Sequence, residues 1–211
     1  MKIVIVTNGI INDLNHLEQI IIKSDYVICA DGAARYLAAL NIYPDLLVGD
    51  LDSISPNDLK QMRDRSVKIE EFPTDKDMTD TELAIEYALE LNPTSITIVG
   101  ALGLRWDHSL GNIMLLAKMI KKGVPCKIID EKTEITIVDR EIELEGNIGD
   151  TISLIPLSNE VKKVTLEGLK YPLLNKNISF GSSLGISNAF IEKQVKITVG
   201  EGLLLVVRDL V

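Results

Sequence analysis

Carboxylates follow a short apolar stretch near residue 50. Residues 46–48 (LLV) are continuously apolar, as in a strand buried on both faces, and Gly49 after them allows a turn or the close approach of a ligand. Asp50 and Asp52 come next, and side chains two apart on extended backbone point the same way, about 6.6 Å apart. Such a pair suits one hard cation. The alternative is a solvated acidic turn that caps the next helix, which is the commoner interpretation of an isolated pattern.

A second acidic segment, residues 75–80 (DKDMTD), begins the next unit of the chain. Thr79 and Glu82 have the spacing of a capping box, which predicts a helix with Asp80 in its first turn. Two acidic clusters that converge on one crevice are harder to explain as solvated turns. Together they favour a divalent-metal site.

A third segment, residues 100–112 (GALGLRWDHSLGN), brings Arg105, Asp107 and His108 to the start of a predicted helix, whose dipole favours anions. This predicts a phosphate site. The alternative is that Asp107 is only the helix N-cap and Arg105 a solvated loop residue. GALG matches neither common phosphate-loop pattern, and a lone histidine at a helix start is more often a hydrogen-bonding residue than a general base. No Ser-His-Asp or Cys-His signature is present, which disfavours covalent catalysis.

The composition indicates an acidic protein of a reducing compartment. Its 211 residues include 22 Lys plus Arg and 31 Asp plus Glu, a net charge of −9, which would repel nucleic acid and anionic membranes. A polyphosphate substrate would then need a divalent cation. Cys29 and Cys126 lie in apolar runs without a CxxC, as buried thiols do. The apolar start of the chain is too short for a signal or a membrane span. We expect a cytoplasmic protein with no nucleic-acid or membrane partner.

Strands and helices alternate through the first part of the chain. That alternation predicts a mostly parallel, Rossmann-like sheet with helices on both faces and a ligand crevice beyond the carboxyl ends of the strands. The expected strands are residues 2–7, 26–30, 46–48, 67–72, 95–99 and 124–129, and the expected helices are residues 14–22, 33–40, 56–62, 79–91 and 110–120.

From about residue 133 the apolar period changes to two, with short β-rich runs separated by turn residues. This predicts an antiparallel β-sandwich or barrel. We therefore expect two domains, an α/β domain over residues 1–138 and an all-β domain over residues 139–211.

Five motifs, in this order along the chain, resemble those of the thiamine pyrophosphokinase family. They are ADGAA (30–34), GDLDSI (49–54), DKDMTD (75–80), GLRWDH (103–108) and GISN (185–188). The resemblance implies that residues 1–138 bind ATP and metal and catalyse the reaction, and that residues 139–211 contribute to thiamine binding and dimerisation. Arg35 departs from the pattern, because many relatives carry asparagine there, and the resemblance gives it no role.

The resemblance implies an ATP:thiamine diphosphotransferase that yields thiamine diphosphate and AMP, with Mg²⁺ as cofactor. The resemblance also implies a homodimer with shared active sites. The implied metal ligands are Asp50, Asp52 and Asp80, which with Asp107 form the catalytic set. The implied substrate-binding residues are Asp31, Asp77, Thr79, Arg105, His108, Ser187 and Asn188.

The chemistry fits these residues, because diphosphoryl transfer asks mainly for positioning and charge neutralisation, without a strong base. Two other classes stay open. One is a different metal-dependent phosphate enzyme, either a phosphohydrolase or a pterin-type pyrophosphokinase, and the other is a nucleotide-sensing module without turnover. Release of AMP that depends on thiamine distinguishes the transferase from both.

Overall fold

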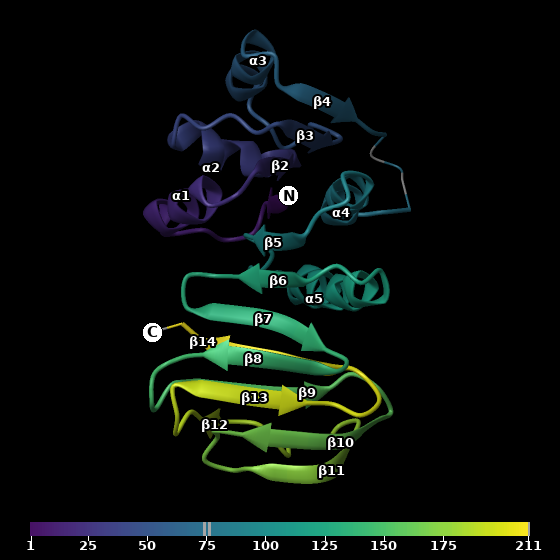
Figure 1. Cartoon of the computed structure of the whole chain (residues 1–211). Coiled ribbons are helices and arrows are strands. Elements are labelled where there is room, and N and C mark those ends of the chain that lie inside the picture. The colour runs from purple at the N-terminus through teal and green to yellow at the C-terminus, as the bar shows by residue number, and fades with distance from the viewer. Residues whose placement is uncertain (74, 76, 211) are drawn as a thin grey trace. The chain divides into compact units, whose positions relative to one another are not determined.

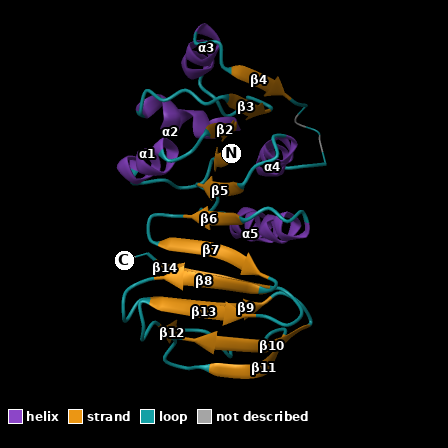
Figure 2. Cartoon of the chain, in the orientation of Figure 1, coloured by secondary structure: helices purple, strands orange, loops and turns teal. Residues whose placement is uncertain are grey.

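The computed structural model describes residues 1–73, 75 and 77–210, and the chain divides into two compact units, Met1–Glu131 and Lys132–Val211. In the described residues, helices occur in the first unit and the second contains strands without an α-helix (Figures 1 and 2). The predicted change from α/β to all-β structure is confirmed. None of the helices described here has the length and apolarity needed to cross a lipid bilayer.

The first unit contains a parallel sheet. Along the sheet, the order is β6-β5-β1-β2-β3-β4. Strand β1 pairs with β2 on one side and with β5 on the other, so the order reverses there, and ligands of α/β sheets bind at such a reversal. The strands are β1 (Lys2–Val6), β2 (Tyr26–Ala30), β3 (Leu46–Gly49), β4 (Lys68–Glu71), β5 (Ser95–Val99) and β6 (Cys126–Ile129).

Helices cover both faces of this sheet. Figure 1 shows α1 and α2 on one side of the strands, and α4 and α5 on the other. Leu17, Leu37 and Met62 of the first three helices pack with alternate strand residues such as Val4 and Cys29. The helices are α1 (Leu14–Ile22), the short 3-10 helix η1 (Asp31–Ala33), α2 (Ala34–Ala39), α3 (Pro56–Asp64), α4 (Asp80–Glu90) and α5 (Trp106–Lys121).

Side-chain caps begin three of these helices, and the sequence predicts those of α3 and α4. The Ser55 hydroxyl accepts from the Asp58 backbone N–H at 3.1 Å, and the Thr79 hydroxyl accepts from that of Glu82 at 3.2 Å. The Glu82 carboxylate, however, accepts from Lys118 Nζ at 3.0 Å. Helix α5 begins at Trp106, earlier than the predicted residue 110, because its polar first turn hides the apolar period.

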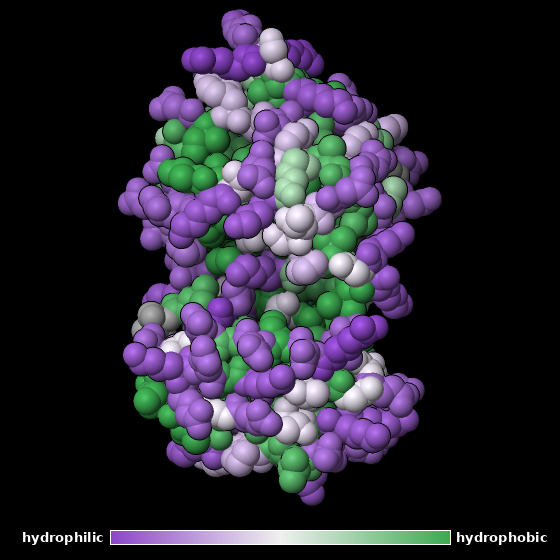
Figure 3. Space-filling view, in the orientation of Figure 1, coloured by the Kyte–Doolittle hydropathy of each residue, from purple (hydrophilic) through white to green (hydrophobic). Residues whose placement is uncertain are grey.

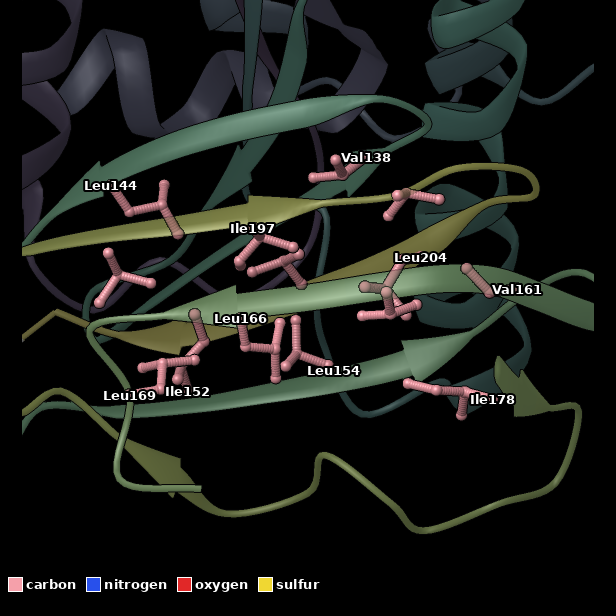
Figure 4. Close-up of a cluster of buried hydrophobic side chains, with 14 of the residues drawn as sticks. Val138, Leu144, Ile152, Leu154, Val161, Leu166, Leu169, Ile178, Ile197 and Leu204 are labelled. Carbon is pink, nitrogen blue, oxygen red and sulfur yellow. The ribbon is translucent and has the colours of Figure 1, made fainter. Parts of the chain in front are cut away.

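The second unit is a sandwich of two antiparallel sheets. Inward-facing residues of both sheets form its core, among them Leu154 and Leu204 from one sheet and Leu166 and Ile197 from the other (Figure 4). One sheet has the order β12-β9-β14-β7, with β7 (Thr133–Val138), β9 (Thr151–Pro156), β12 (Asn188–Ala189) and β14 (Leu204–Asp209). The other has the order β11-β10-β13-β8, with β8 (Glu141–Glu145), β10 (Glu160–Glu167), β11 (Leu173–Ser179) and β13 (Gln194–Thr198).

The division between the units comes before β7, whereas the sequence placed residues 133–138 in the first domain. The reason is pairing at long range. Strand β7 runs antiparallel to β14 from Thr133 opposite Asp209 to Val138 opposite Leu204. Local apolar periodicity carries no information about such a partner.

Hydrophilic residues predominate on the face drawn in Figure 3, with separate hydrophobic patches. Exposed apolar side chains include Leu104 and Trp106 in the first unit and Phe180 in the second. Cys29 and Cys126 are buried thiols, as predicted, and burial raises the pKa of both, that of Cys126 to about 12.

Candidate active site

A cavity of about 650 Å³ lies in the first unit. Residues 7–10, 31, 50, 52–53 and 100–105, which follow β1, β2, β3 and β5, contribute to its lining, as does Ala30 at the end of β2. The first turns of α2, α4 and α5 also contribute to it. The cavity therefore lies at the carboxyl ends of the strands, where the strand order reverses, as the sequence predicts.

Three carboxylates meet in this cavity. One oxygen each of Asp31, Asp50 and Asp52 lies within 4.8 Å of the others. The Asp52 backbone N–H donates to Asp50 Oδ1 at 3.3 Å, and the Ser53 hydroxyl donates to Asp52 Oδ1 at 2.8 Å. These hydrogen bonds in the loop after β3 thus orient the Asp50 and Asp52 carboxylates toward that of Asp31, which follows β2.

Asp31 is the most buried of the three, with 5% of its surface exposed. Among the described residues, nothing hydrogen-bonds to its Oδ1. Desolvation raises the pKa of Asp31, the charges of Asp80 and Asp50 add to the rise, and hydrogen bonds from the Gly32 backbone and the Ser53 hydroxyl oppose it. A buried carboxylate beside other carboxylates is unfavourable unless a cation joins them.

Gly49 makes this arrangement possible. Its φ of 153° lies in a region that residues with a Cβ rarely adopt, and a Cβ at this position would lie 2.8 Å from the Asp31 Cβ. The sequence suggested a turn or the approach of a ligand here. The structure shows that Asp31 itself makes the close approach to β3.

The three carboxylates fit a hard divalent cation. Mg²⁺ takes oxygen ligands at about 2.1 Å, so ligand atoms on opposite sides of it lie roughly 4 Å apart, close to the spread seen here. The sequence proposed Asp80 as the third ligand, whereas the structure groups Asp31 with Asp50 and Asp52. Asp80 begins α4 and lines the same cavity. Asp31 also comes directly after a strand. This position in the chain was the sequence signal that could have placed it in the group.

The start of α5 supplies basic side chains to the same cavity. Arg105 and His108 line it, and Arg105 donates from Nε and Nη2 to the Asp107 carboxylate at 3.2 and 2.6 Å. This guanidinium lowers the pKa of Asp107 to about 2. Asp107 is exposed and is not one of the described lining residues, and Arg105 rather than Asp107 is the N-cap.

Two polar residues of α5 that the sequence analysis did not single out hold the loop before the helix. The Ser109 hydroxyl accepts from the Gly103 backbone N–H at 3.1 Å, and the Asn112 side-chain amide donates to the Ala101 carbonyl at 2.8 Å. These contacts fix the loop that carries Arg105 toward the cavity. Nothing in the local sequence pattern marks them.

The remaining residues of the second acidic segment have different positions. Thr79 lines the cavity and is the N-cap of α4, so its hydroxyl accepts a hydrogen bond from the helix backbone. Asp77 is exposed and lies outside the described lining. Lys76, in the same motif, is outside the described residues.

Ser187 and Asn188 belong to the second unit. Asn188 is 1% exposed; its Oδ1 accepts from the backbone N–H groups of Tyr171 and Ala189, both at 2.9 Å, and its Nδ2 donates to the Tyr171 carbonyl at 2.9 Å. Ser187 is exposed at a φ of 57°, and its backbone N–H donates to the Ser153 hydroxyl at 3.1 Å. The Asn188 amide is therefore occupied within the fold, whereas the Ser187 side chain faces outward.

Comparisons with known proteins agree with this division of the chain. Residues 17–128 match the family model described as "Thiamin pyrophosphokinase, catalytic domain", and residues 134–204 match "Thiamin pyrophosphokinase, vitamin B1 binding domain". A thiamine pyrophosphokinase of Bacillus subtilis is 36% identical over 80% of this chain and 79% of its own.

Solved structures show the same likeness in three dimensions. A crystal structure of thiamine pyrophosphokinase from Bacillus subtilis has a TM-score of 0.88 at 33% identity and covers 99% of both chains. One from Geobacillus thermodenitrificans has a TM-score of 0.85 at 30% identity and covers 100% of this chain and 98% of its own. With matching family models over both units and an acidic cavity where the strand order reverses, the chain belongs to the thiamine pyrophosphokinase family.

Proposed function

We propose that this enzyme transfers the diphosphoryl group of ATP to the hydroxyl of thiamine, giving thiamine diphosphate and AMP. The observation that supports it most is the group formed by Asp31, Asp50 and Asp52 in a cavity at the switch point of the sheet. Such a cavity suits a nucleotide, and the carboxylates suit the cation that accompanies its phosphates.

Asp31, Asp50 and Asp52 would hold Mg²⁺, with Asp80 adding negative charge at the same cavity. The bound ion would supply charge neutralisation on the phosphates. Arg105 and His108 at the start of α5 face the same space, where backbone N–H groups of the helix and the basic side chains favour an anion. These residues bind and orient the nucleotide, so that an acceptor hydroxyl can attack along the line of the breaking bond.

The acceptor side of the reaction is assigned to the second unit. Thiamine carries a permanent positive charge, which an acidic chain attracts. Ser187 presents an exposed side chain next to Asn188, and Asn188 fixes the neighbouring backbone. Our proposal is that Ser187 contacts the acceptor and that Asn188 positions this turn.

We also propose a homodimer in which a second chain completes each site. Tyr36 is the sole Phe, Tyr or Trp among the described residues that line the cavity, so one chain offers the acceptor rings few aromatic contacts. Leu104, at the cavity rim, is 88% exposed, and neighbouring Trp106 is 78% exposed. A second subunit would cover such surfaces and exclude water from the site.

The dimer proposal has a direct test. Chains carrying Asp50→Asn are mixed with chains carrying Ser187→Arg, which adds bulk and positive charge at an exposed position. If the sites are shared, mixed dimers contain one intact site and recover activity that neither variant has alone. An active monomer in sedimentation, or no recovery in verified mixed dimers, contradicts the shared site.

The reaction itself is tested by incubating the protein with ATP and Mg²⁺, with and without thiamine. We expect AMP and thiamine diphosphate in equal amounts only when thiamine is present, and none after EDTA treatment. Phosphate released without an acceptor would instead indicate a phosphohydrolase. AMP formed only with a pterin alcohol would indicate a pterin-type pyrophosphokinase, and ATP binding without products a sensing module.

We place this activity in the cytoplasm. The support is the two buried cysteines, which keep the thiol form that suits a reducing compartment. Cell fractionation with an antibody to the native protein tests the assignment, and a periplasmic or secreted pool as the main fraction would contradict it.

A further inference from the structure

Arg35 brings a positive charge to the acidic cavity and forms no ion pair with a carboxylate of the described residues. It lies in α2, directly after the short helix that Asp31 begins, and it lines the same cavity as Asp50 and Asp52. Its Nη1 donates to Asn8 Oδ1 and to the Gly32 carbonyl, the latter at 3.3 Å. Its Nη2 donates to the Tyr36 hydroxyl at 2.9 Å. All of these acceptors are neutral.

The acceptors that hold Arg35 are themselves fixed. The Tyr36 hydroxyl donates to the Gly9 carbonyl at 2.7 Å and accepts from the Ile11 backbone N–H at 3.3 Å, which ties it to the loop after β1. The guanidinium carbon also lies 4.4 Å from the centroid of the Tyr36 ring. The orientation of this cation is therefore set before any ligand arrives.

The glycine at position 32 gives the Asn8 side chain its place. A Cβ on Gly32 would lie 2.4 Å from Asn8 Nδ2, so a larger residue would push the amide away. Because Asn8 accepts from Arg35, this glycine also protects the orientation of the guanidinium. The whole contact set is built from the loops after β1 and β2.

Part of the guanidinium is left for a ligand. Arginine has five N–H donors, and three of them are used here. The Nε–H and one Nη2–H have no acceptor in the described part of the chain, and no described carboxylate lies within 4.0 Å to form an ion pair with Arg35. Two N–H groups on one guanidinium are the arrangement that binds a phosphate in bidentate fashion. Arg105 differs, because Asp107 already compensates its charge.

We propose that Arg35 is a binding residue for the phosphate groups of ATP, a role that rests on the proposed function of this cavity. Three carboxylates and Asp80 repel a polyphosphate, and a bound divalent cation offsets only part of that charge. Arg35 supplies fixed positive charge in the same cavity. The competing explanation is that Arg35 only ties the loop after β1 to α2.

Direct titration separates these explanations. Binding of ATP with Mg²⁺, and of inorganic tripolyphosphate with Mg²⁺, is measured by calorimetry on the full chain without thiamine. We expect Arg35→Gln to weaken both about tenfold to hundredfold, since a charge-assisted hydrogen bond pair is lost. Arg35→Lys keeps the positive charge but lacks the paired N–H donors of the guanidinium. It should weaken the binding of both probes about threefold to tenfold. The melting temperature and the KM for thiamine should stay close to wild type.

Arg65→Gln is the matched control. Arg65 also lies over a tyrosine ring, 4.9 Å from the centroid of Tyr43, but outside the described cavity lining. It should change neither titration. If Arg35→Gln binds both probes within twofold of wild type, or if Arg65→Gln weakens binding equally, the proposal is wrong. Should Arg35→Gln fail to fold, Arg35→Lys decides, and unchanged binding by that variant overturns the proposal.

The two proposals fail separately. A wild-type chain that binds both probes but makes no thiamine diphosphate contradicts the proposed reaction and leaves the Arg35 comparison valid. A wild-type chain that makes the product while Arg35→Gln binds normally contradicts only the role of Arg35. A wild-type chain that binds neither probe overturns the role of Arg35 as well.

Discussion

Asp31 in the first unit and Asn188 in the second are both polar side chains buried almost completely, with 5% and 1% of their surfaces exposed. Their hydrogen bonding differs. The Asn188 amide uses its oxygen twice and its nitrogen once on neighbouring backbone groups. The Oδ1 of Asp31 has no hydrogen-bond partner in the described chain, and its pKa is raised.

The difference separates structural from ligand-binding roles. A buried polar group with satisfied hydrogen bonds stabilises the fold, and its removal leaves other groups unpaired. A buried carboxylate with one oxygen that lacks a hydrogen bond, lying near other carboxylates, costs stability in the free protein, which is typical of functional sites. On this argument Asp31 belongs to a cation site, whereas Asn188 acts on the fold of its turn.

The largest effect on activity is expected at the two less buried members of the carboxylate group. We expect Asp50→Asn and Asp52→Asn each to lower turnover at least about a thousandfold, because metal charge on a transferring phosphoryl group contributes several kcal/mol. The melting temperature should stay near wild type, since neither side chain is buried. AMP release and circular dichroism measure the two effects.

Asp45→Asn is the control for those variants. Asp45 lies just before β3, and its carboxylate accepts from the Val27 backbone N–H at 2.8 Å. Its loss should change turnover only a few-fold. Full activity of the Asp50 or Asp52 variant with Mg²⁺ would remove the basis for the cation site.

The opposite pattern is expected for Asn188→Ala. Removing the amide leaves backbone groups of Tyr171 and Ala189 unpaired in a partly buried region, which should lower the free energy of unfolding by about 2–4 kcal/mol. Urea denaturation measures the change. Ser187→Ala at the neighbouring exposed position should change stability little. If Asn188→Ala is as stable as wild type and loses only thiamine affinity, the amide contacts the ligand directly.

The arrangement of the site was largely predictable from the sequence. Apolar runs that end in Asp31, Gly49 or Gly100 identify strands whose carboxyl ends meet, and the Thr79 cap locates α4. These signals are local, because a strand or cap depends on residues close in the chain. The α/β class, the sandwich and the cavity position all follow from them.

What could not be predicted depends on contacts at long range. The grouping of Asp31 with Asp50 and Asp52 arises because β2 and β3 are neighbours and Gly49 lets Asp31 approach. The hydrogen bonds of the Asn188 amide depend on Tyr171, and the anchoring of Arg35 depends on Asn8. Hydrogen-bond partners of this kind leave no periodic signal in a single sequence.

The difference in stability between Asp31→Asn and wild type should depend on pH, and this dependence tests the contrast between Asp31 and Asn188. The folded-state pKa of Asp31 is raised, so the native state binds its proton more tightly than the unfolded state does. Stability should therefore fall as pH rises from the ordinary value of 3.8 through the raised pKa. Above that window the metal-free variant should be more stable than wild type. Urea denaturation over a pH series measures this.

Metal provides the control for the Asp31 variant. Added Mg²⁺ should stabilise wild type and have less effect on Asp31→Asn, since the variant offers one ligand charge fewer. Equal stabilisation of both proteins would exclude Asp31 from the cation site. A variant less stable than wild type at every pH would show that the Asp31 carboxylate stabilises the fold, as Asn188 does.

Asp107 represents a third case, a carboxylate that is exposed and already paired, and it should show the smallest effect on stability. Arg105 lowers its pKa to about 2, so the pair stabilises the fold above the ordinary value of 3.8, and that contribution is lost as pH falls toward 2. We expect the melting temperatures of wild type and Asp107→Asn to differ by about 1 °C at neutral pH, to converge near pH 2 and to approach each other in high salt. Turnover should fall about tenfold, because Arg105 loses the partner that orients it beside the cavity. A loss as large as that of Asp50→Asn, at unchanged stability, would instead place the Asp107 carboxylate among the metal ligands.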